Sequence, residues 1–100
     1  MREPKTERAQ RLWRTVALPD NAQRLFSLPM LAALAVIRDL ADEGGCSAPS
    51  VRIAYVAGVS VSTVRAAIER ARVVGLIEIG HISPRGSRVI INKGIGRIAR

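Results

Sequence analysis

Two stretches with helical spacing of apolar residues are separated near the middle of the chain by only three residues, Gly58-Val59-Ser60. Glycine readily adopts the left-handed conformation that ends a helix, and serine is a preferred N-cap residue. We therefore predict a short helix from Pro49-Ser50 to Gly58 and a longer one from the Ser60 cap to Gly75. The two apolar faces consist of Ile53, Ala54 and Ala57 before the break and Val64, Ala67, Ile68, Ala71 and Val74 after it.

Regular elements are also predicted on both sides of this pair of helices. An apolar helix begins at the Ser27 cap and runs to about Glu43, where Gly44-Gly45 end it. After the pair, Leu76 to Ile82 and Arg88 to Asn92 are rich in β-branched residues. They predict a β-hairpin whose loop has five residues, 83–87.

Further segments are predicted at the two ends of the chain. Residues Thr6 to Ala17 predict an amphipathic arm helix with Leu12, Trp13 and Val16 on one face. We expect three parts, namely a basic arm at 1–24, the main domain at 25–92 and a basic tail at 93–100. One hundred residues suffice for one core, so the predicted class is a single mostly α domain with a small β-hairpin.

Positive charge is the first indication of function. The chain has 16 Lys and Arg residues against 8 Asp and Glu, a formal net charge of +8, and 14 of the 16 are Arg. The net charge is negative only in residues 25–50, which hold the predicted core helix. Because the planar fork of arginine suits phosphate groups and guanine edges, nucleic acid is the favoured partner.

No metal, cofactor or catalytic site is predicted. One cysteine, Cys46, and one histidine, His81, cannot supply the three or four ligands of a zinc site. Gly94-Ile95-Gly96 lacks the third glycine and the following helix of a phosphate-binding loop. No nucleophile elbow is present, and the only adjacent carboxylates are Asp42 and Glu43 at a helix end. We therefore expect a protein that is not an enzyme and carries no cofactor.

A run of short motifs covers about three fifths of the chain, from Leu31 to Asn92. The motifs are Asp42 with Gly44 and Gly45, Pro49-Ser50, Ile53-Ala54, Gly58-Val59-Ser60, Thr63-Val64, Ala67-Ile68 and Gly75-Leu76-Ile77. By this run the chain resembles the winged helix-turn-helix domains of small bacterial, phage and plasmid regulators and replication initiators. The resemblance implies that the helix after Gly58-Val59-Ser60 reads DNA and that the hairpin forms the wing.

One position departs from the pattern of that family. Such domains usually carry Leu where this chain has Ala71, so a larger side chain must fill the space. We expect Trp13 or Leu12 of the arm helix to do so. The alternative is that the apolar stripe of the arm packs against a second subunit.

The candidate DNA-binding residues lie around the longer helix, before it and on the hairpin. They are Ser50, Ser60, Ser62, Thr63, Arg65, Glu69, Arg85, Ser87 and Arg88. Arg65 is predicted to contact guanine or phosphate, the alternative being a solvated arginine. Ser62 and Thr63 either contact phosphate or only satisfy the helix end.

The remaining candidates have alternatives of their own. Glu69 either accepts a hydrogen bond from cytosine or lies on a solvated helix face. Arg85 and Arg88 are predicted to contact the DNA backbone or minor groove, whereas the alternative is a charged hairpin tip that discourages edge pairing.

The leading hypothesis is a sequence-specific regulator of transcription that binds double-stranded DNA, of bacterial, phage or mobile-element type. We expect a homodimer, because one winged domain contacts few bases. The alternatives are a replication or recombination accessory protein at an origin or attachment site, and a protein-interaction adaptor. No apolar run approaches the ~18 residues of a spanning helix, so we expect a cytoplasmic, nucleoid-associated protein with no membrane partner and no small-molecule ligand.

Overall fold

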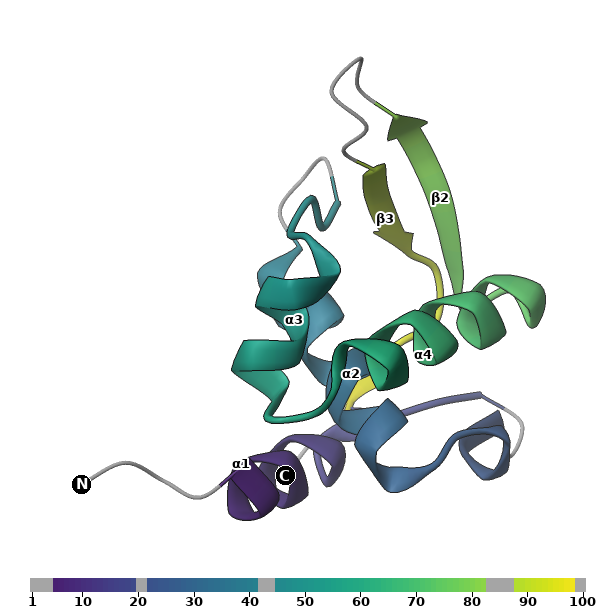
Figure 1. Cartoon of the computed structure of the whole chain (residues 1–100). Coiled ribbons are helices and arrows are strands. Elements are labelled where there is room, and N and C mark those ends of the chain that lie inside the picture. The colour runs from purple at the N-terminus through teal and green to yellow at the C-terminus, as the bar shows by residue number, and fades with distance from the viewer. Residues whose placement is uncertain (1–4, 20–21, 42–44, 83–87, 99–100) are drawn as a thin grey trace.

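The computed structural model describes residues 5–19, 22–41, 45–82 and 88–98 (Figure 1). Its helices are α1 (Lys5–Trp13), the 3-10 helix η1 (Ala22–Leu25), α2 (Leu28–Leu40), α3 (Ser50–Ala57) and α4 (Val61–Val73). Its strands are β1 (Val16–Ala17), β2 (Ile77–Ile82), β3 (Arg88–Asn92) and β4 (Gly96–Arg97). β1 pairs with β4 and β2 with β3, both antiparallel. The predicted class, mostly α with a small β-hairpin, is confirmed.

α2 is the centre of the fold, and every residue of Met30–Ile37 is buried. A helix that is apolar on all sides needs cover on all sides, and α2 packs against α1, α3, α4, β1 and β3. Ser27 caps α2 as predicted, because its Oγ accepts a hydrogen bond from the Met30 amide at 3.4 Å. The predicted end near Glu43 is wrong, since α2 stops at Leu40 and Ala41 is extended.

After α2, the described part of the chain resumes at Gly45, beside β3. Cys46 and Ile90 exchange two backbone hydrogen bonds of 2.8 Å each, and both side chains are fully buried. Gly45 precedes this pair with φ +103°, and a Cβ there would lie 2.7 Å from Val89 Cγ1 and 2.8 Å from the Ile90 carbonyl oxygen. Ala41 is extended and Cys46 is held by its bonds with Ile90, so α2 does not reach the predicted stop at Gly44-Gly45.

α3 and α4 have the predicted boundaries. Gly58 ends α3 in the left-handed conformation, with φ 74° and ψ 34°, and its amide donates to the Ala54 carbonyl. Ser60 caps α4, because its Oγ accepts from the Thr63 amide at 3.1 Å. The predicted apolar faces are buried except for Val74, which is 42% exposed because α4 has already ended at this C-cap residue.

β2 and β3 form the predicted hairpin. Ile77 lies opposite Asn92 and Ile79 opposite Ile90, and the register shifts between Ile79 and Ile82. β2 begins just after α4 and contacts it, so the hairpin stands up from the end of that helix (Figure 1). The predicted loop, 83–87, lies outside the described residues.

The N-terminal helix is shorter than predicted. α1 ends at Trp13, and Val16 and Ala17, which we expected to be helical, form β1. Val16 is fully buried, and the Ile98 amide donates to the Thr15 carbonyl at 2.9 Å to extend the pairing with β4. The helical prediction failed because the partner strand lies near the other end of the chain, where local spacing gives no sign of it.

The segment after β3, predicted as a basic tail, is folded over residues 93–98. The Asn92 side chain organises its turn, since Oδ1 accepts from the amides of Gly94 and Ile95 at 3.1 and 2.7 Å. The Nδ2 group of Asn92 donates to the Ile95 carbonyl at 2.8 Å. Ile95 is buried, and β4 follows it. This segment is therefore part of the core structure.

α1 packs chiefly on α2 and also on α3. Leu12 and Trp13 are half-buried against the core. Arg8 reaches α3, where its Nη1 donates to the Tyr55 carbonyl and its guanidinium lies 5.8 Å from the centroid of the Tyr55 ring. The expectation that the arm helix is structural agrees with these contacts.

One hydrogen bond joins the C-terminal half of α4, which holds Ala71, to the segment before α2. η1 lies beside this half of the helix (Figure 1), and Arg70 of α4 donates to the Leu25 carbonyl. Phe26, which follows η1, is buried. Ala71 is fully buried, and the expectation that Leu12 or Trp13 fills the space beside it stays a prediction.

Candidate nucleic-acid interface

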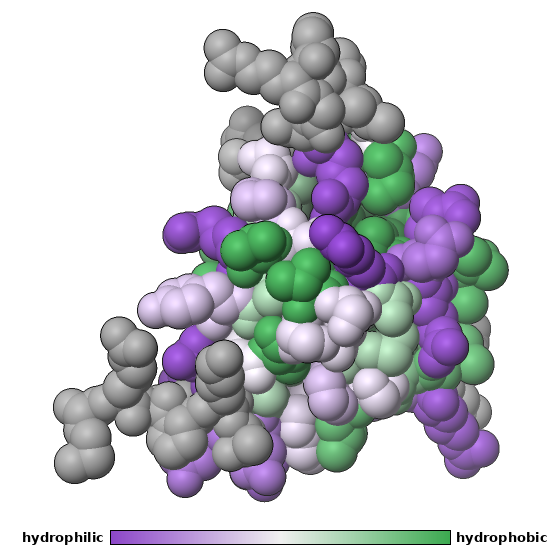
Figure 2. Space-filling view, in the orientation of Figure 1, coloured by the Kyte–Doolittle hydropathy of each residue, from purple (hydrophilic) through white to green (hydrophobic). Residues whose placement is uncertain are grey.

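α3 and α4 are joined by residues 58–60, and their axes meet at 107°. Both helices pack one face on α2, so the opposite face of α4 is left on the surface. We call this surface the α4 face. It consists of Ser62, Arg65, Ala66, Glu69 and Val73, all exposed as the helical wheel predicted. In the space-filling view, hydrophilic side chains gather where the hairpin, α3 and α4 meet (Figure 2).

Three hydroxyl side chains cluster at the N-terminus of α4. The Oγ of Ser60 lies 3.1 Å from that of Ser62 and 2.8 Å from Thr63 Oγ1. Ser60 and Ser62 are exposed, and Thr63 is half-buried. Ser60 satisfies the helix end through the Thr63 amide, whereas Ser62 stays exposed with Ser60 Oγ as its neighbour. The positive end of the helix dipole favours an anion at this position.

Arg65 is the free cation of the α4 face. Its side chain is exposed and makes no hydrogen bond or ion pair with the other described residues. A guanidinium has five N–H donors and no acceptor. All of them are therefore available to a partner that approaches this face.

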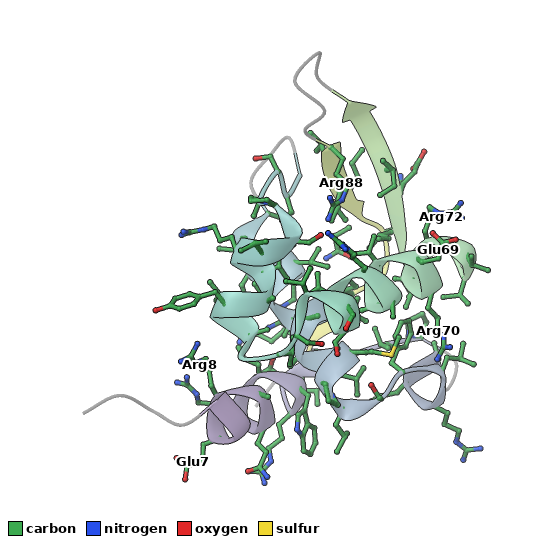
Figure 3. The ribbon with its side chains drawn as sticks, in the orientation of Figure 1. Glu7, Arg8, Glu69, Arg70, Arg72 and Arg88 are labelled. Carbon is green, nitrogen blue, oxygen red and sulfur yellow. The ribbon has the colours of Figure 1, made fainter. Side chains whose placement is uncertain are left out.

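Glu69 is already engaged by a neighbour on the same helix (Figure 3). Arg72 donates to both of its carboxylate oxygens, from Nη2 at 2.6 Å and from Nε at 3.2 Å. This hydrogen bond holds the pKa of Glu69 below its ordinary value and, in return, raises the pKa of Arg72. The ionised pair has no net charge. A contact of Glu69 with cytosine would have to replace Arg72.

Arg72 was missed in the sequence analysis, although the spacing of i and i+3 between Glu69 and Arg72 is the signal for such a pair. Arg70 was also missed. Its hydrogen bond with Leu25 could not be found from spacing, because the two residues belong to different elements. Arg70 and Arg72 both have hydrogen-bond partners in the structure, whereas the donors of Arg65 are not used by the other described residues.

Arg88 and Ser50 were predicted separately, and the structure brings them together. Arg88 begins β3, and its Nη2 donates to Ser50 Oγ in the first turn of α3 at 2.8 Å. The Nε atom of Arg88 is buried without a hydrogen-bond partner among the described residues. In the stick view the side chain lies between the start of β3 and α3 (Figure 3). Arg88 thus ties the hairpin to α3 instead of extending from its tip.

The two other hairpin candidates, Arg85 and Ser87, lie outside the described residues. Of the nine candidates, the described ones form two groups. Ser60, Ser62, Thr63, Arg65 and Glu69 line α4 and its cap, whereas Ser50 and Arg88 join α3 to β3.

Within the described ranges, no three His, Cys, Asp or Glu side chains converge as metal ligands would. In the same part of the chain no single helix is long and apolar enough to cross a membrane, and α3 and α4 meet that length and composition only as a bent pair. No protein-family model, curated protein or solved structure matches this chain.

Proposed function

We propose that this protein binds double-stranded DNA in a sequence-specific way, as a winged helix-turn-helix regulator of transcription. The observation that carries the proposal is the exposed α4 face, with unpaired Arg65 behind a hydroxyl-rich N-terminus, on a chain with net charge +8. A helix presented in this way fits the major groove of B-DNA. The hairpin forms the wing beside it.

The relation between α3 and α4 supports the helix-turn-helix part of the proposal. Helix-turn-helix motifs join two helices at about 90–120° through a turn of three or four residues that often contains glycine. In this chain the angle is 107° and the turn is 58–60, with glycine first. Both values lie within the range for the motif.

Arg65 is the residue that we assign to base recognition. It lies one turn beyond Ser62, and its donors are free. A bidentate contact with the O6 and N7 atoms of guanine is the commonest specific contact that arginine makes. Ser62 and the N-terminal amides of α4 would hold a phosphate on one side of the groove.

The link between Arg88 and Ser50 gives the hairpin a role in positioning. Because Arg88 Nη2 is bonded to Ser50 Oγ, the wing is held against the start of α3. α3 in turn packs on α4. We assign the contacts with the DNA backbone to the hairpin loop, which includes Arg85 and Ser87. Two copies of the chain would bind paired half-sites, and the place of action would be the nucleoid in the cytoplasm.

The test is a selection of random duplexes, followed by fluorescence anisotropy on the selected site. We expect one enriched sequence and an affinity that falls steeply with salt. Arg65→Gln should cost about 1–3 kcal/mol and relax discrimination at one base position. Arg24→Gln removes the same charge from an exposed residue of η1 and is the matched control.

Three results would count against the proposal. Enrichment of no sequence, with affinity that is steep in salt, would indicate a packaging protein instead. Weak binding that is insensitive to salt would favour the protein-interaction adaptor. An equal loss for Arg65→Gln on all sequences would reassign Arg65 to phosphate.

A further inference from the structure

A second basic surface lies on α1 and β4. It is a hollow of about 590 Å³ lined by Glu7, Gln10, Arg11, Arg14, Thr15, Arg97 and Ile98. We call it the α1–β4 hollow. Three of its seven lining residues are arginines and one is an acid, so its lining carries a net positive charge. Neither α4 nor the hairpin contributes to it.

One nearly buried arginine, Arg38 of α2, holds Thr15 in the lining of the hollow, and its own side chain is 9% exposed. Its Nη1 donates to the carbonyls of Thr15 and Gly96 at 3.1 and 3.0 Å, and its Nη2 donates to Thr15 Oγ1 at 2.9 Å. Its remaining bonds go to both carboxylate oxygens of Asp39. Every donor of Arg38 is therefore used, and Thr15, β4 and α2 are joined at one point.

Arg97 and Arg14 are positioned on the rim without losing their capacity to bind. One nitrogen of Arg97, Nη2, donates to Asp39 Oδ1 at 2.8 Å, while the side chain stays 58% exposed. The guanidinium of Arg14 lies over the Trp13 ring, 5.5 Å from its centroid. Stacking occupies the face of a guanidinium and leaves its N–H edges free. Arginines held in this way lose little rotamer freedom when a ligand binds.

The α1–β4 hollow and the α4 face belong to different sides of α2. α1 and α4 each pack on α2, and α1 has its other contacts with α3. In Figure 1, α4 crosses in front of α2, whereas α1 lies below α4. A duplex on the α4 face therefore leaves the hollow open to another ligand.

We propose that the α1–β4 hollow holds the phosphate backbone of a second DNA duplex, so that one molecule joins two DNA segments. This inference rests on the proposed function, since it needs the α4 face to hold the first duplex. Phosphodiester oxygens suit the ligand set, because separate guanidinium forks can each bind a different phosphate. The hollow adds no base-reading feature, so the second duplex is held without regard to sequence.

The experiment is a bridging assay on the full chain. A biotinylated duplex with the selected site is fixed on beads, and retention of a free fluorescent duplex of unrelated sequence is measured. The unmodified protein should retain the free duplex, and retention should fall with rising salt. Arg14→Gln with Arg97→Gln should reduce retention about tenfold by removing phosphate contacts, while affinity for a short duplex with the site changes less than about twofold.

Two further variants make the result specific. Arg14→Gln alone leaves the bond between Arg97 and Asp39 in place, so it tests the hollow even if the double variant is unstable. Arg24→Gln lowers the net charge by the same amount as Arg14→Gln, but it lies on η1 and lines a different depression. Retention should be unchanged in Arg24→Gln.

The outcomes separate this inference from the proposed function. If the unmodified protein binds no duplex at all, the proposed function fails. If it binds the selected site but retains no second duplex, or if Arg14→Gln and the double variant bridge normally, the inference is overturned. A double variant that loses affinity only for long single duplexes would also overturn it, because the hollow would then contact the same DNA.

Discussion

The two basic surfaces of this protein are held in place by different kinds of interaction. The α4 face depends on neighbours in sequence, since Gly58 closes α3 and Ser60 Oγ accepts from the Thr63 amide. The α1–β4 hollow depends on Arg38, which joins Thr15 and Gly96 from opposite ends of the chain. One surface is therefore built locally, whereas the other depends on long-range contacts, those of Arg38 and the pairing of β1 with β4.

The difference has a consequence for stability. Loss of one cap weakens a helix end, and its cost is limited to the cap itself. Loss of Arg38 would remove the hydrogen bonds to Thr15, Gly96 and Asp39 at once and leave part-buried acceptors without donors. A single substitution should therefore destabilise the hollow more than the α4 face. The structure of each surface should be lost without loss of the other.

The largest effect on stability is expected for Arg38→Ala. Removing one partner of a nearly buried, fully hydrogen-bonded charge should lower the free energy of unfolding by about 3 kcal/mol. Urea denaturation measures the loss, and hydrogen exchange locates it. The Ile98 amide, bonded to the Thr15 carbonyl, should lose protection, whereas the Thr63 amide should keep it. Equal loss at both amides would show that the two surfaces are one cooperative unit.

A smaller effect is expected for Ser60→Ala. Loss of the N-cap should cost about 1 kcal/mol, because one amide of the first turn loses its acceptor. Ser62→Ala is the matched control and should change stability by no more than about 0.5 kcal/mol. The measurement is again urea denaturation, combined with exchange at the Thr63 amide. If Ser62→Ala costs as much as Ser60→Ala, the cap is shared by the cluster.

The smallest effect concerns acid pH. Burial alone would raise the pKa of Asp39, but hydrogen bonds and charge from Arg38 and Arg97 outweigh it and hold this pKa below the ordinary 3.8. A carboxyl with a lowered folded-state pKa stabilises the fold above its ordinary pKa. This contribution is lost as the pH falls below about 3.8 towards the folded-state value.

The matched pair for the acid test is Asp39→Asn and Glu69→Gln. The difference in stability between pH 6 and pH 3, roughly the range over which carboxylates titrate, should shrink in Asp39→Asn. Glu69 also has a lowered pKa, through its hydrogen bond from Arg72, but it is on the exposed α4 face. Its replacement should change the pH dependence less, because solvent screens an exposed pair. A larger change for Glu69→Gln would contradict the ranking.

Much of the fold was predictable because its signals are local. Gly58, Ser60 and Ser27 mark helix ends through the conformations and hydrogen bonds that these residue types favour. The outward residues of α4 followed from helical periodicity. Arg65 was therefore found from the sequence, together with the hydroxyl cluster that precedes it.

Other features had no local signal. β1 and β4 are each two residues long, and such strands exist only because each supplies the partner of the other. The bond from Arg88 to Ser50 likewise joins candidates that the sequence presented separately. Neither the contact of η1 with α4 nor the early end of α2 is encoded in the spacing of residues nearby.

By itself, then, the sequence determined the positive charge, the helix boundaries around Gly58-Val59-Ser60 and the outward face of α4, because caps and periodicity act over a few residues. Only the tertiary structure decided that α1 covers α2, that residues 93–98 belong to the core, and that Arg38 joins both ends of the chain. The physical reason is that a buried guanidinium takes its acceptors wherever folding brings carbonyl oxygens, and distance along the chain does not restrict that choice.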